Sequence, residues 1–264
     1  MSAEESTTEN RHTTEEDTEL CVHDITPEKR EEMQRALAHI LLRFKLDWKV
    51  MKAIMLTTGA VISGSAALAV LQGGEFVPQD LDIYVTSENM AAVLVFLQEQ
   101  NYAVVMPVPG AKRNVYPKSS VTLTLRNDMG EKIDLVATTE QHVVHAVTQF
   151  HSTCVMNYIA YYSIVCLYPE WTMRKTAFVK AELMDEAVIH KYRGRGFAMM
   201  KASSEMPEYE PMHRCGTHQC CPKTRRELHD HATLCIPLDD EELTIRTEED
   251  RVGWVLDKDH ICSV

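Results

Sequence analysis

The sequence predicts an α/β (α+β) fold in which a mixed sheet with flanking helices is followed by a helical C-terminal part. Three observations support this prediction. Residues 53–74 carry no charge and end at a Gly-Gly pair, which is typical of a buried strand followed by a buried helix. Short apolar runs bounded by turn residues follow between residues 81 and 136, as expected for strands. From Thr138 onward the apolar residues recur at helical spacing.

The first ordered element is expected to be a helix. Residues 1–25 are rich in Glu, Thr and Ser and poor in large apolar residues, so we expect a disordered acidic tail there. Thr26 is a good helix N-cap, and Pro27 suits the first helical position. The apolar face of this helix comprises Met33, Leu37, Ile40, Leu41 and Phe44.

Strands and helices are then expected to alternate. We predict a buried strand over residues 53–63, a helix over 65–72 and a second strand over 81–86. Ser87 is expected to cap a helix that runs to about Glu99.

Turn residues place the remaining elements. Further strands are predicted over residues 102–107, 121–125 and 132–136, and Asn127 to Gly130 is typical of a hairpin turn between the last two. Helices are predicted near residues 139–149, 153–167 and 179–200.

These elements divide the chain into five expected parts. They are a disordered acidic tail (1–25), an α/β core (26–138), a helical part (139–205), a Cys/His-rich segment (206–235) and an acidic C-terminal tail (236–264).

The acidity of the chain is concentrated at its ends. Of the net charge of −12, residues 1–25 carry −7 and residues 236–264 carry −6, which leaves +1 for the rest. Because the middle has no dense basic run, broad binding to duplex nucleic acid is not indicated.

The sequence shows no cationic leader followed by an apolar core. We therefore expect an intracellular protein, cytoplasmic or nuclear, with no membrane association. In such a compartment the eight cysteines are expected to be free thiols or metal ligands rather than disulfides.

Two acidic residues stand one residue apart on a predicted strand. Asp80 and Asp82 therefore point to the same face, while Leu81 points to the other. Neighbouring carboxylates repel unless a cation lies between them, and Mg²⁺ prefers a few carboxylates, waters and substrate phosphates. This segment predicts metal-assisted chemistry on a phosphate.

The order of three motifs resembles the nucleotidyltransferase superfold, the DNA polymerase beta superfamily. The motifs are Gly64-Ser65 at the start of a helix, the Asp80/Asp82 pair, and Asp134 within Lys132-Ile-Asp-Leu-Val136. The resemblance covers about residues 50–140. The chain also looks similar to uncharacterised fungal proteins of this fold, through Phe150-His-Ser-Thr153 and Arg193-Gly-Arg-Gly-Phe197.

This resemblance implies a catalytic triad of Asp80, Asp82 and Asp134 that holds one or two Mg²⁺ ions. Gly64 would let backbone amides approach a phosphate, and Ser65 at a helix N-terminus would hold it. The implied reaction moves a nucleotide from an NTP to an acceptor by in-line attack at the α-phosphate. The acceptor could be RNA, protein or a small molecule.

Three other residues are candidates for binding the nucleotide, and each also has a structural explanation. Lys112 and Arg113 could contact phosphates, but a solvated loop tip explains them as well. His151 could line the nucleotide pocket, or it could simply precede helix-capping residues.

Three basic residues near the end of the last predicted helix also have two explanations. Lys191, Arg193 and Arg195 could contact the triphosphate or the acceptor, or they could complement the helix dipole.

Residues 213–235 contain eight Cys and His residues. The candidate zinc ligands are Cys215, Cys220, Cys221 and Cys235, with His229 and His231 nearby. No Cys-x-x-Cys pair is present, so a loop pinned to the core, or a disulfide within the segment, stays open as an alternative.

Two alternatives to an enzyme remain at this point. The chain could be a catalytically inactive protein of this fold that still binds nucleotides. It could also be a protein-interaction module that uses the Cys/His-rich segment and the acidic tails.

Overall fold

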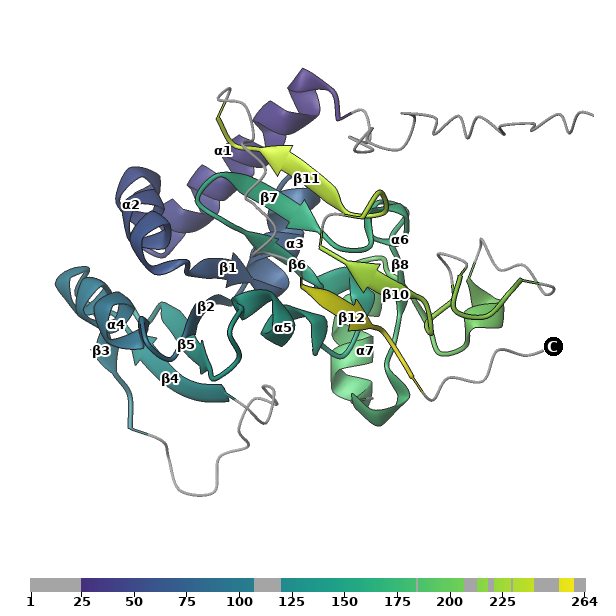
Figure 1. The fold of residues 1–264 in the computed structure, drawn as a ribbon. Helices are drawn as coiled ribbons and strands as arrows, with labels where there is room; N and C mark the ends of the chain where they lie inside the picture. Colours follow the sequence, from purple (N-terminus) through teal and green to yellow (C-terminus); the bar gives the residue numbers. More distant parts are fainter. Residues whose placement is uncertain are drawn as a thin grey trace, which may run out of the picture.

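The computed structural model describes residues 25–106, 120–183, 185–206, 213–217, 221–228, 230–239 and 252–258 (Figure 1). Its centre is an eight-stranded sheet in the order β11-β7-β6-β1-β2-β5-β4-β3. Only β2 and β5 pair in parallel among these neighbours, so the sheet is mixed, as predicted. The strands are β1 Val61–Ser63, β2 Asp80–Thr86, β3 Ala103–Val104, β4 Ser120–Arg126, β5 Lys132–Thr138, β6 Asn157–Ile159, β7 Ser163–Cys166 and β11 Leu234–Pro237.

Helices and two small sheets surround this central sheet (Figure 1). The α-helices are α1 Pro27–Arg43, α2 Trp48–Thr58, α3 Gly64–Leu71, α4 Met90–Glu99, α5 Val143–Thr148, α6 Pro169–Met173 and α7 Glu186–Arg193. Short 3₁₀ helices are η1 Thr153–Val155, η2 Ala181–Leu183 and η3 Ser203–Glu205. The small sheets pair β8 Thr176–Phe178 with β9 Ala198–Met200 and β10 Arg225–Glu227 with β12 Gly253–Val255.

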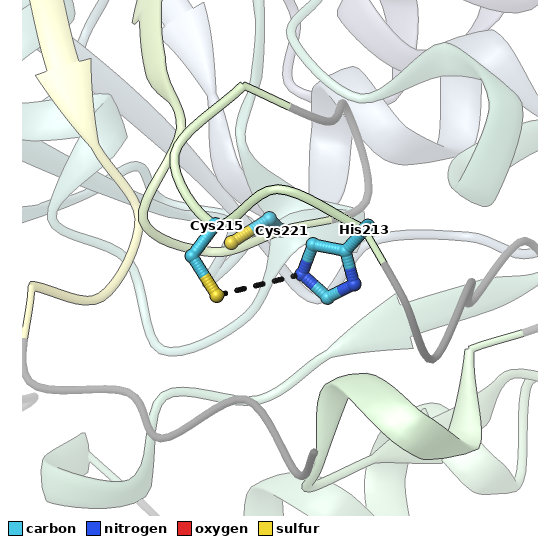
Figure 2. Close-up of side chains that lie close together, drawn as sticks. All are labelled: His213, Cys215 and Cys221. Atoms are coloured by element: carbon cyan, nitrogen blue, oxygen red, sulfur yellow. Dashed lines mark hydrogen bonds between the residues drawn. The ribbon is translucent and has the colours of Figure 1, made fainter.

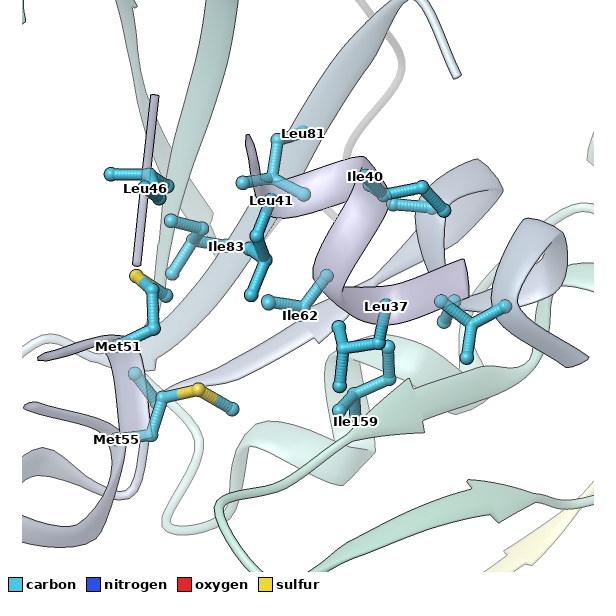
Figure 3. Close-up of a cluster of buried hydrophobic side chains, with 14 of the residues drawn as sticks. Leu37, Ile40, Leu41, Leu46, Met51, Met55, Ile62, Leu81, Ile83 and Ile159 are labelled. Carbon is cyan, nitrogen blue, oxygen red and sulfur yellow. The ribbon is translucent and has the colours of Figure 1, made fainter. Parts of the chain in front are cut away.

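Apolar side chains cover both faces of the sheet. On one face Leu81 and Ile83 of β2 pack with Leu37 and Leu41 of α1 and with Met55 of α2 (Figure 3). On the other face Tyr84 of β2 packs with residues of α5, β6 and β7. Because side chains alternate along a strand, Asp80 and Asp82 lie on the same face as Tyr84.

The first helix and the hairpin follow the sequence prediction. The Thr26 side chain accepts a hydrogen bond from the Lys29 amide, and Pro27 begins α1. In the turn between β4 and β5 the Asn127 side chain accepts hydrogen bonds from the amides of Met129 and Glu131.

The strand predicted over residues 53–63 is wrong for most of its length. Helix α2 extends to Thr58, and its start is capped by Asp47, whose side chain accepts from the Val50 amide at 3.2 Å. Gly59, with φ +66°, ends the helix, and only Val61–Ser63 form a strand. An uncharged run has little polar periodicity that could separate a helix from a strand. The capping residues Asp47 and Gly59 therefore indicate the helix better than the apolar pattern does.

Two other boundaries differ around α4. Ser87 does not cap this helix, because its hydroxyl donates to the Thr138 carbonyl at the end of β5. The helix begins at Met90, and Asn89 stands at its N-cap. The strand expected over 102–107 is shorter, since β3 contains only Ala103–Val104.

The helix predicted near residues 153–167 is also wrong. This stretch holds one 3₁₀ turn and then the antiparallel hairpin of β6 and β7. Every residue of the two strands is buried, so the apolar residues do not alternate with polar ones. Helices do form within 139–149 and 179–200, as the shorter α5 and α7.

The five-part division of the chain stays a prediction. Strand β11 runs across the expected boundary between residues 235 and 236. Residues 1–24 and most of the acidic C-terminal tail lie outside the described residues. Within the described part of the chain, no helix is both long enough and apolar enough to span a membrane.

Candidate functional site

The register of three adjacent strands brings the predicted carboxylates together. Parallel pairing of β2 with β5 places Asp82 beside Asp134 and Asp80 beside Lys132. Antiparallel pairing of β1 with β2 places Ser63 on the other side of Asp82. Positions two apart on a strand share a face, so the three carboxylates and Lys132 form one cluster on the sheet.

Asp134 is the deepest member of this cluster. It is 0% exposed, and one carboxylate oxygen accepts a hydrogen bond from the Thr124 hydroxyl at 2.7 Å. The other oxygen accepts from the Lys132 ammonium at 2.7 Å. A carboxylate removed from water needs such partners to remain ionised, and here they are supplied by β4 and by its own strand.

Lys132 links two of the three acids. Its Nζ lies 3.2 Å from Asp80 Oδ2 in addition to its contact with Asp134. Burial disfavours the ammonium, but the hydrogen bonds and charges of Asp134 and Asp80 outweigh it and raise the pKa of Lys132. Lys132 has no role in the sequence-based prediction, although it stands two residues before Asp134 and therefore on the same strand face.

Gly64 forms the turn between β1 and α3, directly against Asp82. Its φ is +65°, and a Cβ at this position would lie 2.4 Å from Asp82 Oδ2. The backbone conformation therefore favours glycine, and any side chain here would displace the Asp82 carboxylate. The Asp82 carboxylate packs against the backbone that begins α3.

Ser65 follows at the first turn of α3. It is 4% exposed, and its hydroxyl has no hydrogen-bond partner among the residues that the structure describes. Buried hydroxyls are usually hydrogen-bonded, so an orphan beside a helix N-terminus and a carboxylate cluster is suited to a polar ligand. Every residue of α3 is buried, which fixes this N-terminus in place.

Basic and aromatic side chains from α7 and the turn after it lie near the cluster. The Arg195 guanidinium carbon is 3.9 Å from the ring centroid of Phe76 and 5.2 Å from that of Tyr192. Its Nη1 is buried and makes no hydrogen bond to any described residue. Phe76 comes from the loop between α3 and β2, so this stacking joins that loop to α7.

Lys191 also lies near the acids. Its side chain stays accessible to solvent, but the protein packed around the ammonium and the nearby Arg195 lower its pKa. The charges of Asp80 and Asp82 oppose this shift, which shows that Lys191 is near them. Arg193, the third basic residue considered, is exposed at the end of α7.

His151 packs against Tyr192 of α7. Its ring centroid is 5.5 Å from that of Tyr192. Burial, and then the charge of Lys191, lower the pKa of His151 to about 4. Its imidazole is therefore neutral near pH 7. The next residues are tied inward: the Ser152 hydroxyl lies 3.3 Å from the Cys154 sulfur, and the Thr153 hydroxyl accepts from the Phe178 amide.

The other residues predicted for the nucleotide and zinc sites lie away from the carboxylate cluster or outside the described residues. Lys112, Arg113 and Cys220 lie outside the described residues, so their roles stay predictions. Cys235 lies on β11, where burial raises the pKa of its thiol to about 11. Cys215 and Cys221 converge, and the residue that joins them is His213 rather than Cys235.

No protein-family model and no curated protein sequence matches the chain. Among solved structures, it is similar to the apo form I of a CCA-adding enzyme, with 12% identity and a TM-score of 0.44 over 64% of this chain and 43% of that one. The complex of a CCA-adding enzyme with ATP gives 14% identity and a TM-score of 0.41, over 62% and 43% of the two chains.

The Thermotoga maritima CCA-adding enzyme complexed with tRNA_CCA gives 14% identity and a TM-score of 0.40, over 70% of this chain and 42% of that one. The chain spans less than half the length of these enzymes. Likeness at this level concerns the fold and decides nothing about activity. The similarity to fungal proteins stays a prediction.

Proposed function

We propose that the chain is a Mg²⁺-dependent nucleotidyltransferase that moves a nucleotide from an NTP to an acceptor. One observation carries the proposal: Asp80, Asp82 and Asp134 share one face of two paired strands, beside the Gly64-Ser65 start of a buried helix. Carboxylates and helix amides in this arrangement suit a metal-bound triphosphate.

The residues present fit a magnesium ion. The donors are hard carboxylate oxygens, and Asp80 and Asp82 are both partly accessible on the same strand face. When bound, the ion would neutralise phosphate charge and polarise the reacting phosphorus. Asp134 differs, since its oxygens already accept from Thr124 and Lys132. We therefore assign one ion to Asp80 and Asp82, with the Lys132 ammonium supplying the positive charge beside Asp134.

The phosphate groups would meet several groups of the chain itself. The amides at the start of α3 and the orphan Ser65 hydroxyl can donate to phosphate oxygens. Lys191 and the stacked Arg195 add positive charge from α7 and the turn after it. Because Arg195 packs against the rings of Phe76 and Tyr192, its guanidinium is already oriented before the ligand arrives.

In the proposed reaction an acceptor hydroxyl oxygen attacks the α-phosphorus in line. A bond forms between these atoms, the bond to the β-phosphate oxygen breaks, and pyrophosphate leaves. The proton of the hydroxyl passes to a carboxylate of the cluster. The acceptor, whether RNA, protein or a small molecule, depends on surfaces beyond these residues.

The test compares two acid-to-amide variants. Asp82→Asn removes a carboxylate that packs on Gly64, whereas Asp128→Asn changes an exposed residue of the hairpin turn. We expect Asp82→Asn to lower Mg²⁺-dependent NTP affinity about tenfold or more, and Asp128→Asn to leave it unchanged. Titration calorimetry with each NTP, with and without Mg²⁺, measures this, and pyrophosphate release reports turnover. Wild-type protein that binds no NTP would refute the proposal.

A second candidate, an inactive nucleotide-binding protein of the same fold, is favoured by Lys132. Its ammonium neutralises both Asp80 and Asp134, which leaves fewer carboxylate oxygens for metal. This candidate predicts NTP binding that does not depend on Mg²⁺ and no pyrophosphate release with any acceptor. The same titrations, repeated with EDTA, separate the two candidates.

A further inference from the structure

A histidine and two cysteines converge in the segment between η3 and β10, away from the carboxylate cluster in sequence. The side chains of His213, Cys215 and Cys221 turn toward one another (Figure 2), and one ligand atom from each lies within 4.8 Å of the others. The His213 Nε2 and Cys215 sulfur are 3.9 Å apart. We propose that these three residues bind a zinc ion that fastens residues 213–217 to the rest of the fold.

The donor set favours zinc on chemical grounds. Two sulfurs and one imidazole nitrogen are soft or borderline ligands, which Zn²⁺ accepts in a tetrahedron and Mg²⁺ does not. An ion about 2.0–2.3 Å from each ligand atom fits between atoms already this close. Binding converts each cysteine thiol to a thiolate and releases its proton to solvent. Three protein ligands leave one tetrahedral position for a further ligand.

Two tight turns present the ligands. Thr217 closes the first turn, since its amide and hydroxyl both donate to the Arg214 carbonyl. Gly216, with φ +82°, reverses the chain there and donates its amide to the Cys221 sulfur at 3.4 Å. An amide that donates to sulfur stabilises the thiolate form, which is the form that binds metal.

The second turn, Cys221 to Thr224, is attached to the folded core. The first turn meets the second at the cluster of His213, Cys215 and Cys221. Cys221 is 2% exposed and accepts from the Thr224 amide through its carbonyl, and Pro222 accepts from the Asp257 amide. Just after this turn Arg226 pairs with Asp230 and donates to a core carbonyl. In contrast, Cys215 is exposed.

This arrangement gives the metal a structural role. Residues 213–217 contain no large apolar side chain that could anchor them by burial. A metal that joins Cys215 and His213 to the buried Cys221 would supply the missing attachment, because binding energy gained only in the folded state stabilises that state. The proposal is independent of nucleotide transfer, which uses other residues.

The test measures the zinc content of the full chain after gel filtration in buffer without chelator. We expect about one zinc per chain in the wild type and much less in Cys215→Ala, which changes an exposed residue and should not disturb folding. Cys235→Ala is the matched control, since this thiol lies on β11 outside the cluster, and it should keep its zinc.

Two further measurements distinguish loss of zinc binding from loss of folding in the variants. Cobalt added to the metal-free wild type should give the absorption of tetrahedral thiolate coordination, and Cys215→Ala should lose it. Chelation should lower the melting temperature of the wild type but not of Cys215→Ala. Wild-type protein without bound zinc, or Cys215→Ala and Cys235→Ala with equal zinc content, would overturn the proposal.

Discussion

Gly64→Ala separates the two reasons for which a glycine stands between β1 and α3. The first reason is backbone conformation: φ is +65°, and an alanine there costs about 1–2 kcal/mol. The second is space, because the new Cβ would lie 2.4 Å from Asp82 Oδ2, against the 3.0 Å below which real Cβ contacts essentially never occur. The carboxylate would have to retreat by about 0.6 Å.

Gly59→Ala is the matched control for the first reason alone. Gly59 has nearly the same φ, +66°, at the end of α2, but no atom of the described residues would lie within 4 Å of a Cβ added there. We expect both variants to lose about 1–2 kcal/mol of unfolding free energy. The atom that Gly64→Ala displaces is the end of a side chain, so moving it adds little to this loss but removes Asp82 from its place.

The assay therefore combines urea denaturation with NTP titration in Mg²⁺. Gly64→Ala should bind NTP at least about tenfold more weakly, or 1.4 kcal/mol, while Gly59→Ala should bind like the wild type. A folded Gly64→Ala protein with unchanged NTP affinity would show that the contact between Gly64 and Asp82 does not belong to the site. Equal loss of binding in both variants would point to general destabilisation instead.

Three other predictions follow from the same geometry. Ser65→Ala removes an orphan hydroxyl, so stability should stay equal or rise while NTP affinity falls several-fold; a large loss of stability would contradict this. Lys132→Met removes the cation beside the buried Asp134 and should cost about 3–5 kcal/mol of unfolding free energy in urea denaturation; unchanged stability would refute the role of the ion pair. Because the pKa of His151 falls from 6.5 to about 4 on folding, the unfolded chain binds more protons between these values, and stability should drop as pH falls. We expect about 1–2 kcal/mol less stability at pH 5 than at pH 7 from this group, and a weaker pH dependence in His151→Gln.

The Asp80/Asp82 pair could be predicted because it depends on a local rule, whereas Asp134 is linked to it only through the family resemblance. Asp80 and Asp82 share a face by the period of a strand, and the predicted helix start at Gly64-Ser65 is the start of α3, directly after β1. The wrong secondary-structure predictions fall on segments where the pattern of polar and apolar residues does not separate helix from strand. Residues 53–58 carry no charge, and the strands within 153–167 are buried on both faces, so neither stretch shows a polar pattern that separates helix from strand.

The sequence by itself determined which acids face one way, that Gly64-Ser65 begins a helix and which segment is rich in metal-ligating residues. Only the tertiary structure decided their partners. Lys132 meets Asp80 because β2 and β5 pair in parallel in one register, and Arg195 meets Phe76 because α7 packs near the loop before β2. His213 replaces Cys235 beside Cys215 because β11 pairs with β7 and carries Cys235 into the sheet. Such contacts join residues distant in the chain, and their formation depends on the packing of the whole fold rather than on local spacing.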